Sequence, residues 1–139
     1  MKNISIIAYV LFISGCTDSV VKKDLHLLNG YWEIAKVTFP DGNHKEYKAN
    51  TSIDYISVTD NEGFRKKVQP KLDGTFDTSD DAVAFSILET ENGLAFSYKN
   101  ELSEWMEELI ELSHTHFSTK NEEGLIYKYQ RFEPININK

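Results

Sequence analysis

Short segments in which apolar and polar residues alternate follow one another along most of the chain. The first runs from Trp32 to Phe39 and slips by one position at Ala35. Alternation with a period of two, rich in aromatic and β-branched residues, is typical of a strand with one face in water. The pattern therefore predicts a strand here, and the slip at Ala35 indicates a β-bulge.

Similar segments predict further strands over 44–48, 53–58, 64–69, 82–89, 94–99, about 107–113 and 125–132, and residues 114–119 are expected to form a further strand or its turn. The turn residues Pro40-Asp41-Gly42-Asn43 separate the first two strands, and Asn92-Gly93 between two alternating runs predicts a hairpin. Residues 72–76 are expected to form a turn and residues 77–81 an acidic loop. About eight or nine short strands without a βαβ pattern favour an antiparallel barrel or sandwich.

The barrel is favoured because hairpins dominate and because closure removes exposed sheet edges. We therefore expect an all-β fold, a small antiparallel up-and-down barrel with at most one short helical turn. Residues 100–112 fit two interpretations, because their apolar residues fall at helical spacing but also suit an edge strand. We expect a helical turn over 101–106 and a strand after it.

The first fifteen residues have the layout of a secretory signal. A basic start is followed by the apolar run Ile4 to Ile13, and this run of about 10 residues is shorter than the roughly 20 that a spanning helix needs. Ile13-Ser14-Gly15-Cys16 resembles the lipobox of bacterial lipoproteins, which implies cleavage before Cys16 and acylation of its sulfur. Cys16 is the one cysteine of the chain, and acylation explains an unpaired thiol in an exported protein.

The lipobox resemblance implies a membrane anchor of two or three acyl chains, and two chains are enough for stable attachment. Thr17, where an aspartate would mark retention in the inner membrane, implies transfer to the outer membrane. We expect a cell-envelope protein in the outer membrane facing the periplasm, with the cell surface as the alternative. The expected organisation is a signal peptide over 1–15, the lipidated cysteine and a tether over 16–26, the barrel over 27–133 and a tail over 134–139.

Composition narrows the choice of partner. Removing the first 15 of the 139 residues leaves 124, enough for one domain with its own core. The formal net charge of −7 argues against binding to nucleic acid, whose phosphates require basic residues, and could favour a basic partner.

Three motifs carry a second resemblance: Leu28-Asn29-Gly30-Tyr31-Trp32, Trp105-Met106-Glu107-Glu108, and the closing segment from Gly124 through Tyr127 and Tyr129 to Arg131. Together they resemble the lipocalins, and more closely the small lipocalin-like lipoproteins common in Bacteroidetes. The resemblance implies that Arg131 packs over Trp32 at the closed end of the barrel, next to Gly30. A guanidinium over an indole face gains about 0.5–2 kcal/mol, so this pair would link the first strand to the last.

Inward-facing aromatic residues are the candidates for a binding site: Phe85, Phe96, Tyr98, Tyr127 and Tyr129. They could line an apolar pocket or fill a small barrel completely, and both interpretations remain open. His114 and His116 are two of the four ligands that zinc usually takes, so no metal site or cofactor is expected. Glu104, Glu107, Glu108 and Glu111 are interpreted as a solvated acidic face, and no catalytic signature accompanies them.

Two hypotheses of function follow. The first is a membrane-anchored, non-catalytic binding module that holds a small hydrophobic ligand inside the barrel. The second is an acidic solid-barrel interaction protein, inhibitor-like or structural, that binds another envelope protein through its surface.

Overall fold

The computed structural model describes residues 19–134, so the predictions for the signal peptide, for Cys16 and for the last five residues lie outside the described part. One short 3-10 helix precedes ten strands. Their bounds are η1 Lys22–Leu28, β1 Gly30–Thr38, β2 His44–Glu46, β3 Ile53–Thr59, β4 Glu62–Pro70, β5 Phe76–Thr78, β6 Val83–Thr90, β7 Gly93–Lys99, β8 Glu104–Leu112, β9 His116–Asn121 and β10 Ile126–Arg131.

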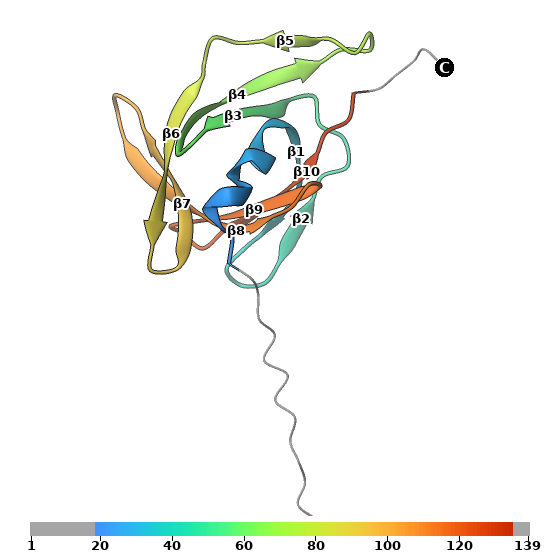
Figure 1. The fold of residues 1–139 in the computed structure, drawn as a ribbon. Helices are drawn as coiled ribbons and strands as arrows, with labels where there is room; N and C mark the ends of the chain where they lie inside the picture. Colours follow the sequence, from blue (N-terminus) through green and yellow to red (C-terminus); the bar gives the residue numbers. More distant parts are fainter. Residues whose placement is uncertain (1–18, 135–139) are drawn as a thin grey trace, which may run out of the picture.

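Eight of these strands form a closed antiparallel barrel (Figure 1). Neighbours follow the order β10-β9-β8-β7-β6-β4-β3-β1, and β10 pairs with β1 to close the circle. The short strands β2 and β5 pair with β1 and β4 outside this circle. The all-β antiparallel barrel predicted from the alternation is confirmed, and so is the bulge, which shifts the register of β1 between Ile34 and Lys36.

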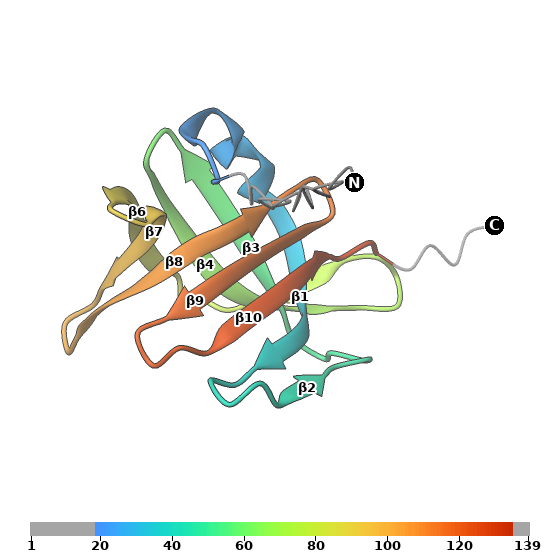
Figure 2. The same ribbon diagram turned by 90° about the horizontal axis from the view of Figure 1, so that it is seen from below.

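Neighbouring strands run in opposite directions, so the turns that join them lie at one or the other end of the barrel. The β3–β4, β6–β7 and β8–β9 turns lie at the end where β1 begins, and η1 lies against this end (Figure 2). The amide of Val58 donates to Oδ1 of Asn29 over 2.7 Å and joins the β3–β4 hairpin to the entry of β1. The β7–β8 and β9–β10 turns lie at the opposite end, which no helix of the described residues covers. We call these the closed end and the open end.

Helix η1 contributes to the hydrophobic core at the closed end. Leu25 and Leu28 lie three residues apart, which places them on one face of a helix with three residues per turn, and both are buried. Trp32 is fully buried beneath them, donates from Nε1 to the Leu28 carbonyl over 2.8 Å, and packs edge-on against Phe117. The folded part therefore begins within the segment that we expected to be a tether, because Leu25 belongs to the core.

Arg131 holds the closed end together from outside the core. Its guanidinium carbon lies 4.0 Å from the centroid of the Trp32 ring, so the predicted contact is present. Its three nitrogens donate to the backbone carbonyls of Leu27, Asn29 and His114 over 2.7 to 2.9 Å. Gly30 makes room for this side chain, because a Cβ built there would lie 2.7 Å from Nη1 of Arg131.

Two local predictions were wrong, and pairing explains both. Residues 104–106 belong to strand β8 instead of a helical turn, because Trp105 pairs with Tyr98 of β7 and their rings stack. The helical spacing of the apolar residues gave a wrong prediction because it included Leu102. This residue is 95% exposed in the turn before the strand and is not part of an apolar face. The predicted turn and acidic loop over 72–81 contain strand β5, whose Phe76 stacks on Tyr31 on the outside of the barrel.

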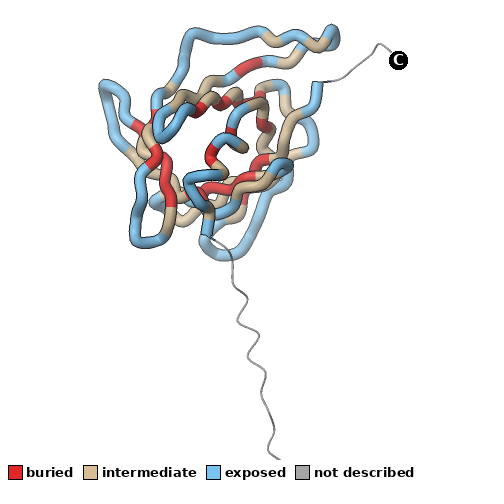
Figure 3. The backbone as a smooth tube through the Cα atoms, viewed as in Figure 1, coloured by how far each residue is buried: buried red, intermediate tan, exposed pale blue. Residues whose placement is uncertain are grey.

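Burial follows the inside of the barrel (Figure 3). The main core cluster contains the helix leucines, Trp32 and inward residues from six further strands, among them Ile56, Phe96 and Phe117. These large side chains are concentrated toward the closed end. The closed half of the barrel is therefore filled by apolar side chains.

We expect Arg131→Met to lower the free energy of unfolding by about 2 kcal/mol, because three charge-assisted hydrogen bonds and the contact with Trp32 are lost. Lys128→Met is the matched control on the same strand, since its ammonium lies 3.9 Å from Glu111 in an exposed pair worth at most a few tenths of a kcal/mol. Urea unfolding followed by circular dichroism measures both. Equal losses in the two variants would contradict a special role for Arg131.

Candidate functional site

A cavity of about 290 Å³ opens inside the barrel at its open end. Strands β3, β4, β6, β7, β8 and β10 supply its walls. Its apolar part is lined by Val83, Tyr98, Trp105, Tyr127 and Tyr129, and its polar part by Asp54, Arg65, Lys66, Lys67, Asp81 and Glu107. A second hollow of about 470 Å³ lies outside the barrel near Phe76 and Phe132. Because its lining reaches Pro134, the last described residue, the barrel cavity is the better-defined site.

Alternation along the strands places these residues. Inward positions on β7 are Leu94, Phe96 and Tyr98, in order from the closed to the open end. The apolar residues at the closed end therefore give way to a tyrosine where β7 reaches the cavity. Strand β8 runs in the opposite direction, so Glu107 lies nearer the cavity than the buried Leu109.

Aromatic rings form the flat part of the wall. The rings of Tyr98 and Trp105 stack with centroids 5.1 Å apart and planes 13° apart. Tyr129 stacks in the same way on Phe117, which anchors it to the core. Tyr98 and Tyr129 are buried, whereas Trp105 and Tyr127 are only half-buried, so part of their surface faces the cavity.

The five aromatic residues predicted from the sequence divide into two groups. Tyr98, Tyr127 and Tyr129 line the cavity. Phe85 and Phe96 are not part of the cavity lining; they pack edge-on with ring centroids 4.9 Å apart in the core cluster, to which Tyr98 and Tyr129 also belong. The barrel is thus filled in its closed half and hollow in its open half, which combines the two interpretations left open by the sequence.

A buried ion pair forms the base of the polar part. The side chain of Asp54 is only 3% exposed, and its Oδ2 accepts from Nη2 of Arg65 over 2.7 Å. Its Oδ1 pairs with Nζ of Lys67, also at 2.7 Å, although the lysine side chain is 67% exposed. Arg65 also lies over the Tyr129 ring, 4.8 Å from its centroid, and donates to the hydroxyl of Tyr98 over 3.4 Å.

These contacts set the protonation states in the cavity. Burial alone would raise the pKa of Asp54, but the adjacent charges of Arg65 and Lys67 outweigh it and hold the pKa below its ordinary value. Burial raises the pKa of Tyr98 to about 12 and also raises the pKa of Tyr129. At neutral pH the cavity therefore presents a charged carboxylate, a guanidinium and two protonated phenols.

The Asp54–Arg65–Lys67 cluster was not among the sites that we predicted from the sequence. We predicted strands over residues 53–58 and 64–69 but assigned no role to Asp54, Arg65 or Lys67. The alternation of the first of these strands contains a sign of the cluster, because Asp54 lies on the same face as the apolar Ile56 and Val58. An acidic residue on an apolar face needs a buried cation as partner.

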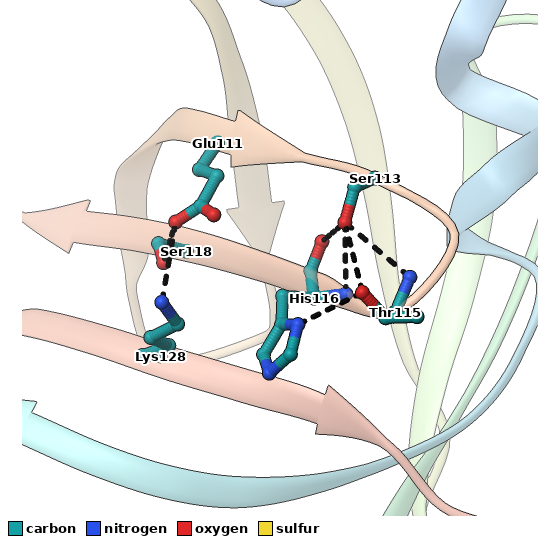
Figure 4. Close-up of polar contacts among 6 residues, drawn as sticks. All are labelled: Glu111, Ser113, Thr115, His116, Ser118 and Lys128. Carbon is teal, nitrogen blue, oxygen red and sulfur yellow. Dashed lines mark hydrogen bonds and ion pairs between the residues drawn. The ribbon is translucent and has the colours of Figure 1, made fainter.

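The remaining β8 carboxylates lie outside the barrel and have partners there. Glu104 pairs with Lys99 at 2.9 Å, and Glu108 accepts a hydrogen bond from Asn92 over 3.2 Å. Glu111 accepts from Ser118 over 3.0 Å, next to Lys128 (Figure 4). Of the four predicted members of the acidic face, Glu107 alone lines the cavity.

The two histidines lie at the closed end, away from the cavity. His114 is in the β8–β9 turn, where its carbonyl accepts from Arg131. His116 begins β9, and its Nδ1 lies 2.9 Å from the hydroxyl of Thr115 (Figure 4). Within residues 19–134 no three His, Cys, Asp or Glu side chains come together in a way that could hold a metal ion. No helix in the same range has the length and apolar character needed to cross a membrane.

Comparison with known proteins gives one family and two structures. A family profile described as a lipocalin-like domain matches residues 28–119, more than half of the chain. A lipocalin-like protein from Bacteroides uniformis is 11% identical, with 76% of this chain and 99% of that chain covered and a TM-score of 0.47. Apocrustacyanin C1 is also 11% identical, with 81% and 64% covered and a TM-score of 0.44. No curated protein matches the sequence.

We expect Asp54→Asn to lower the free energy of unfolding by about 3 kcal/mol at pH 7, because it leaves Arg65 without its buried counter-charge. The pKa of Asp54 is lower in the folded than in the unfolded state, so its contribution is complete above about pH 4 and is lost as the pH falls through the folded value. The difference between variant and wild type should therefore shrink in urea titrations at pH 3. A difference that stays constant with pH, or an equal effect of Asp80→Asn in an exposed loop, would contradict this assignment.

Proposed function

Because the chain belongs to the lipocalin-like domain family, we propose that it is a non-catalytic binding protein that takes a small apolar ligand into the open end of its barrel. The observation that carries the proposal is the cavity of about 290 Å³ with its aromatic walls. Binding cavities of proteins usually measure about 300–1,000 Å³ and are lined mainly by apolar groups with a few polar ones. The cavity lies at the lower limit of this range, which favours a small ligand.

The shape of the wall favours a flat ligand. The stacked rings of Tyr98 and Trp105 have nearly parallel planes, and Trp105 and Tyr127 still expose part of their surface. A planar apolar molecule placed against them would remove that surface from water, at about 25 cal/mol per Å². The packed Phe85 and Phe96 beneath limit how deeply a ligand can enter.

The titratable groups of the cavity suit binding better than catalysis. Proton transfer at neutral pH is most efficient when the pKa of the acid or base lies near 7. Tyr98, with its pKa raised to about 12, keeps its proton, and Asp54, with its pKa lowered, keeps its charge. Such groups position a ligand but do not exchange protons with it.

The second part of the proposal is the lipid anchor on Cys16. It is supported by the lipobox-like Ile13-Ser14-Gly15-Cys16 and by the place where the folded part begins. Val20 already packs against the core, so only residues 17–19 separate the cysteine from the domain. We place the protein in the outer membrane facing the periplasm, with the cell surface as the alternative. The carboxylates on the outer face of β8 already have partners within the domain, and this favours the cavity over the acidic surface as the binding site.

The neutral dye N-phenyl-1-naphthylamine, which fluoresces strongly in apolar surroundings, tests the cavity. We expect the domain, residues 16–139 with Cys16→Ser, to bind this dye and to lose at least tenfold in affinity with Val83→Trp, because the larger side chain fills the cavity. Ile110→Trp is the matched control, since Ile110 is partly exposed on the outer face of β8. Fluorescence titration measures the affinities, and the same loss in both variants, or dye binding by neither variant nor wild type, would refute the proposal.

Metabolic labelling with palmitate in a Gram-negative host tests the anchor. We expect label on the full-length protein and recovery in the membrane fraction, whereas Cys16→Ser should carry no label and should leave the membrane. Mass spectrometry of the mature protein should place its N-terminus at Cys16. A Cys16→Ser protein that stays in the membrane fraction would show that something other than acylation holds it there.

A further inference from the structure

Hydrogen-bond donors outnumber free acceptors on the β3–β4 side of the cavity. A guanidinium carries five N–H donors, and the structure gives partners to two from Arg65, at Asp54 and at Tyr98. Both oxygens of Asp54 are already paired, one with Arg65 and one with Lys67. This side therefore offers a ligand unused donors and no unpaired carboxylate oxygen.

The nearby phenol and ammonium add to these donors. The hydroxyl oxygen of Tyr98 accepts from Arg65, which leaves its own proton available. The ammonium of Lys67 uses one of its three N–H groups on Asp54. Donors from β4 and β7 thus converge where the aromatic wall meets the ion pair.

The net charge of the Asp54–Arg65–Lys67 cluster also favours an acceptor group on the ligand. Arg65 and Lys67 share the single carboxylate of Asp54, so the three side chains carry a net charge of about +1. The side chain of Arg65 is only 14% exposed, and a charge in such surroundings acts on a ligand with less screening than a surface charge. An acceptor that brings a negative charge would satisfy both the donors and the excess positive charge.

We propose that the cavity selects ligands that carry an anionic group, a carboxylate or a sulfonate, held by Arg65, Lys67 and Tyr98 while the flat apolar part lies against Trp105. This inference rests on the proposed function of the same cavity and names the chemical class of its ligand. Arg65 and Lys67 are then the specificity-determining residues, because the aromatic wall treats charged and neutral rings alike.

Glu107 determines where the anionic group lies. Its carboxylate lines the β8 side of the cavity, without a hydrogen bond or an ion pair from any side chain in residues 19–134. Asp81 adds a second carboxylate in the loop before β6, the strand that pairs with β4. An anion is repelled from Glu107 and is directed to the β3–β4 side. Removing the charge of Glu107 should therefore strengthen anion binding, opposite to the effect of removing Lys67.

Two dyes with the same ring skeleton test the inference. 8-Anilinonaphthalene-1-sulfonate differs from N-phenyl-1-naphthylamine by a sulfonate group, so the ratio of their affinities isolates the contribution of the charge. We expect the sulfonate to bind about tenfold more tightly at low ionic strength, with a smaller ratio at 0.5 M salt because the exposed ammonium of Lys67 is screened.

Three variants identify the groups responsible. Lys67→Met should weaken sulfonate binding about threefold, and the double variant Asp54→Asn/Arg65→Gln should bring the affinity ratio close to one. Glu107→Gln should strengthen sulfonate binding about threefold. For each variant the sulfonate affinity is divided by the affinity of the same variant for the neutral dye, so that a change in the cavity walls does not count as a change in charge selectivity; binding of the neutral dye also shows that the variant is folded. Lys128→Met removes the same charge as Lys67→Met on the outside of the barrel and should change neither affinity.

The outcomes separate this inference from the proposed function. If the neutral dye binds but the sulfonate has no advantage, or if Lys67→Met and Lys128→Met have the same effect, the anionic class is wrong and the cavity remains a binding site. If neither dye binds, the proposed function fails and the inference fails with it. A sulfonate advantage that is lost with Lys67 and Arg65 and raised by Glu107→Gln supports both.

Discussion

Pairing of the first barrel strand with the last is the constraint on which the rest of the structure depends. Strands β1 and β10 are about a hundred residues apart in the sequence, and their contact turns an open sheet into a closed wall. Arg131 reinforces this contact at one end by bonding to three backbone carbonyls and covering the Trp32 ring. Without closure, the inward residues of the eight strands would have no common interior.

The interior of the closed barrel has an apolar half and a half that contains buried charges. In the half next to η1, large apolar side chains meet and exclude water. In the other half, Asp54 and Arg65 are buried together, although removing two charges from water costs as much as their attraction returns. A buried pair of this kind adds little to stability compared with apolar residues of the same size. Its presence beside a cavity fits the proposed role of that cavity in holding an anionic group.

Much of this arrangement could be predicted from the sequence because period-two alternation determines strands and faces together. Alternation located the strands of the barrel and the bulge near Ala35, and the resemblance to the lipocalins implied the contact of Trp32 with Arg131 between its first and last strands. The prediction was wrong at residues 101–106, because the spacing of their apolar residues also suits a helix. Residues 104–106 form a strand because they pair with β7.

The candidate site was harder to predict for a similar reason. Tyr98, Tyr127 and Tyr129 were recognisable as inward aromatics, but whether inward residues line a space or fill it depends on the packing of all strands together. Asp54 and Arg65 are eleven positions apart on neighbouring strands, and their pairing depends on the register between those strands. Local composition shows only an acidic residue in one strand and a basic run in the next.

The chain enters the barrel from the end that η1 covers, and the cavity opens at the other end. Four peptide units span at most about 15 Å, so an attachment at Cys16 would hold the closed end close to the attached surface. The opening would then face the aqueous compartment, with the full length of the barrel between it and the lipid. A molecule leaving such a cavity would pass into solution or to a protein alongside, not sideways into the bilayer.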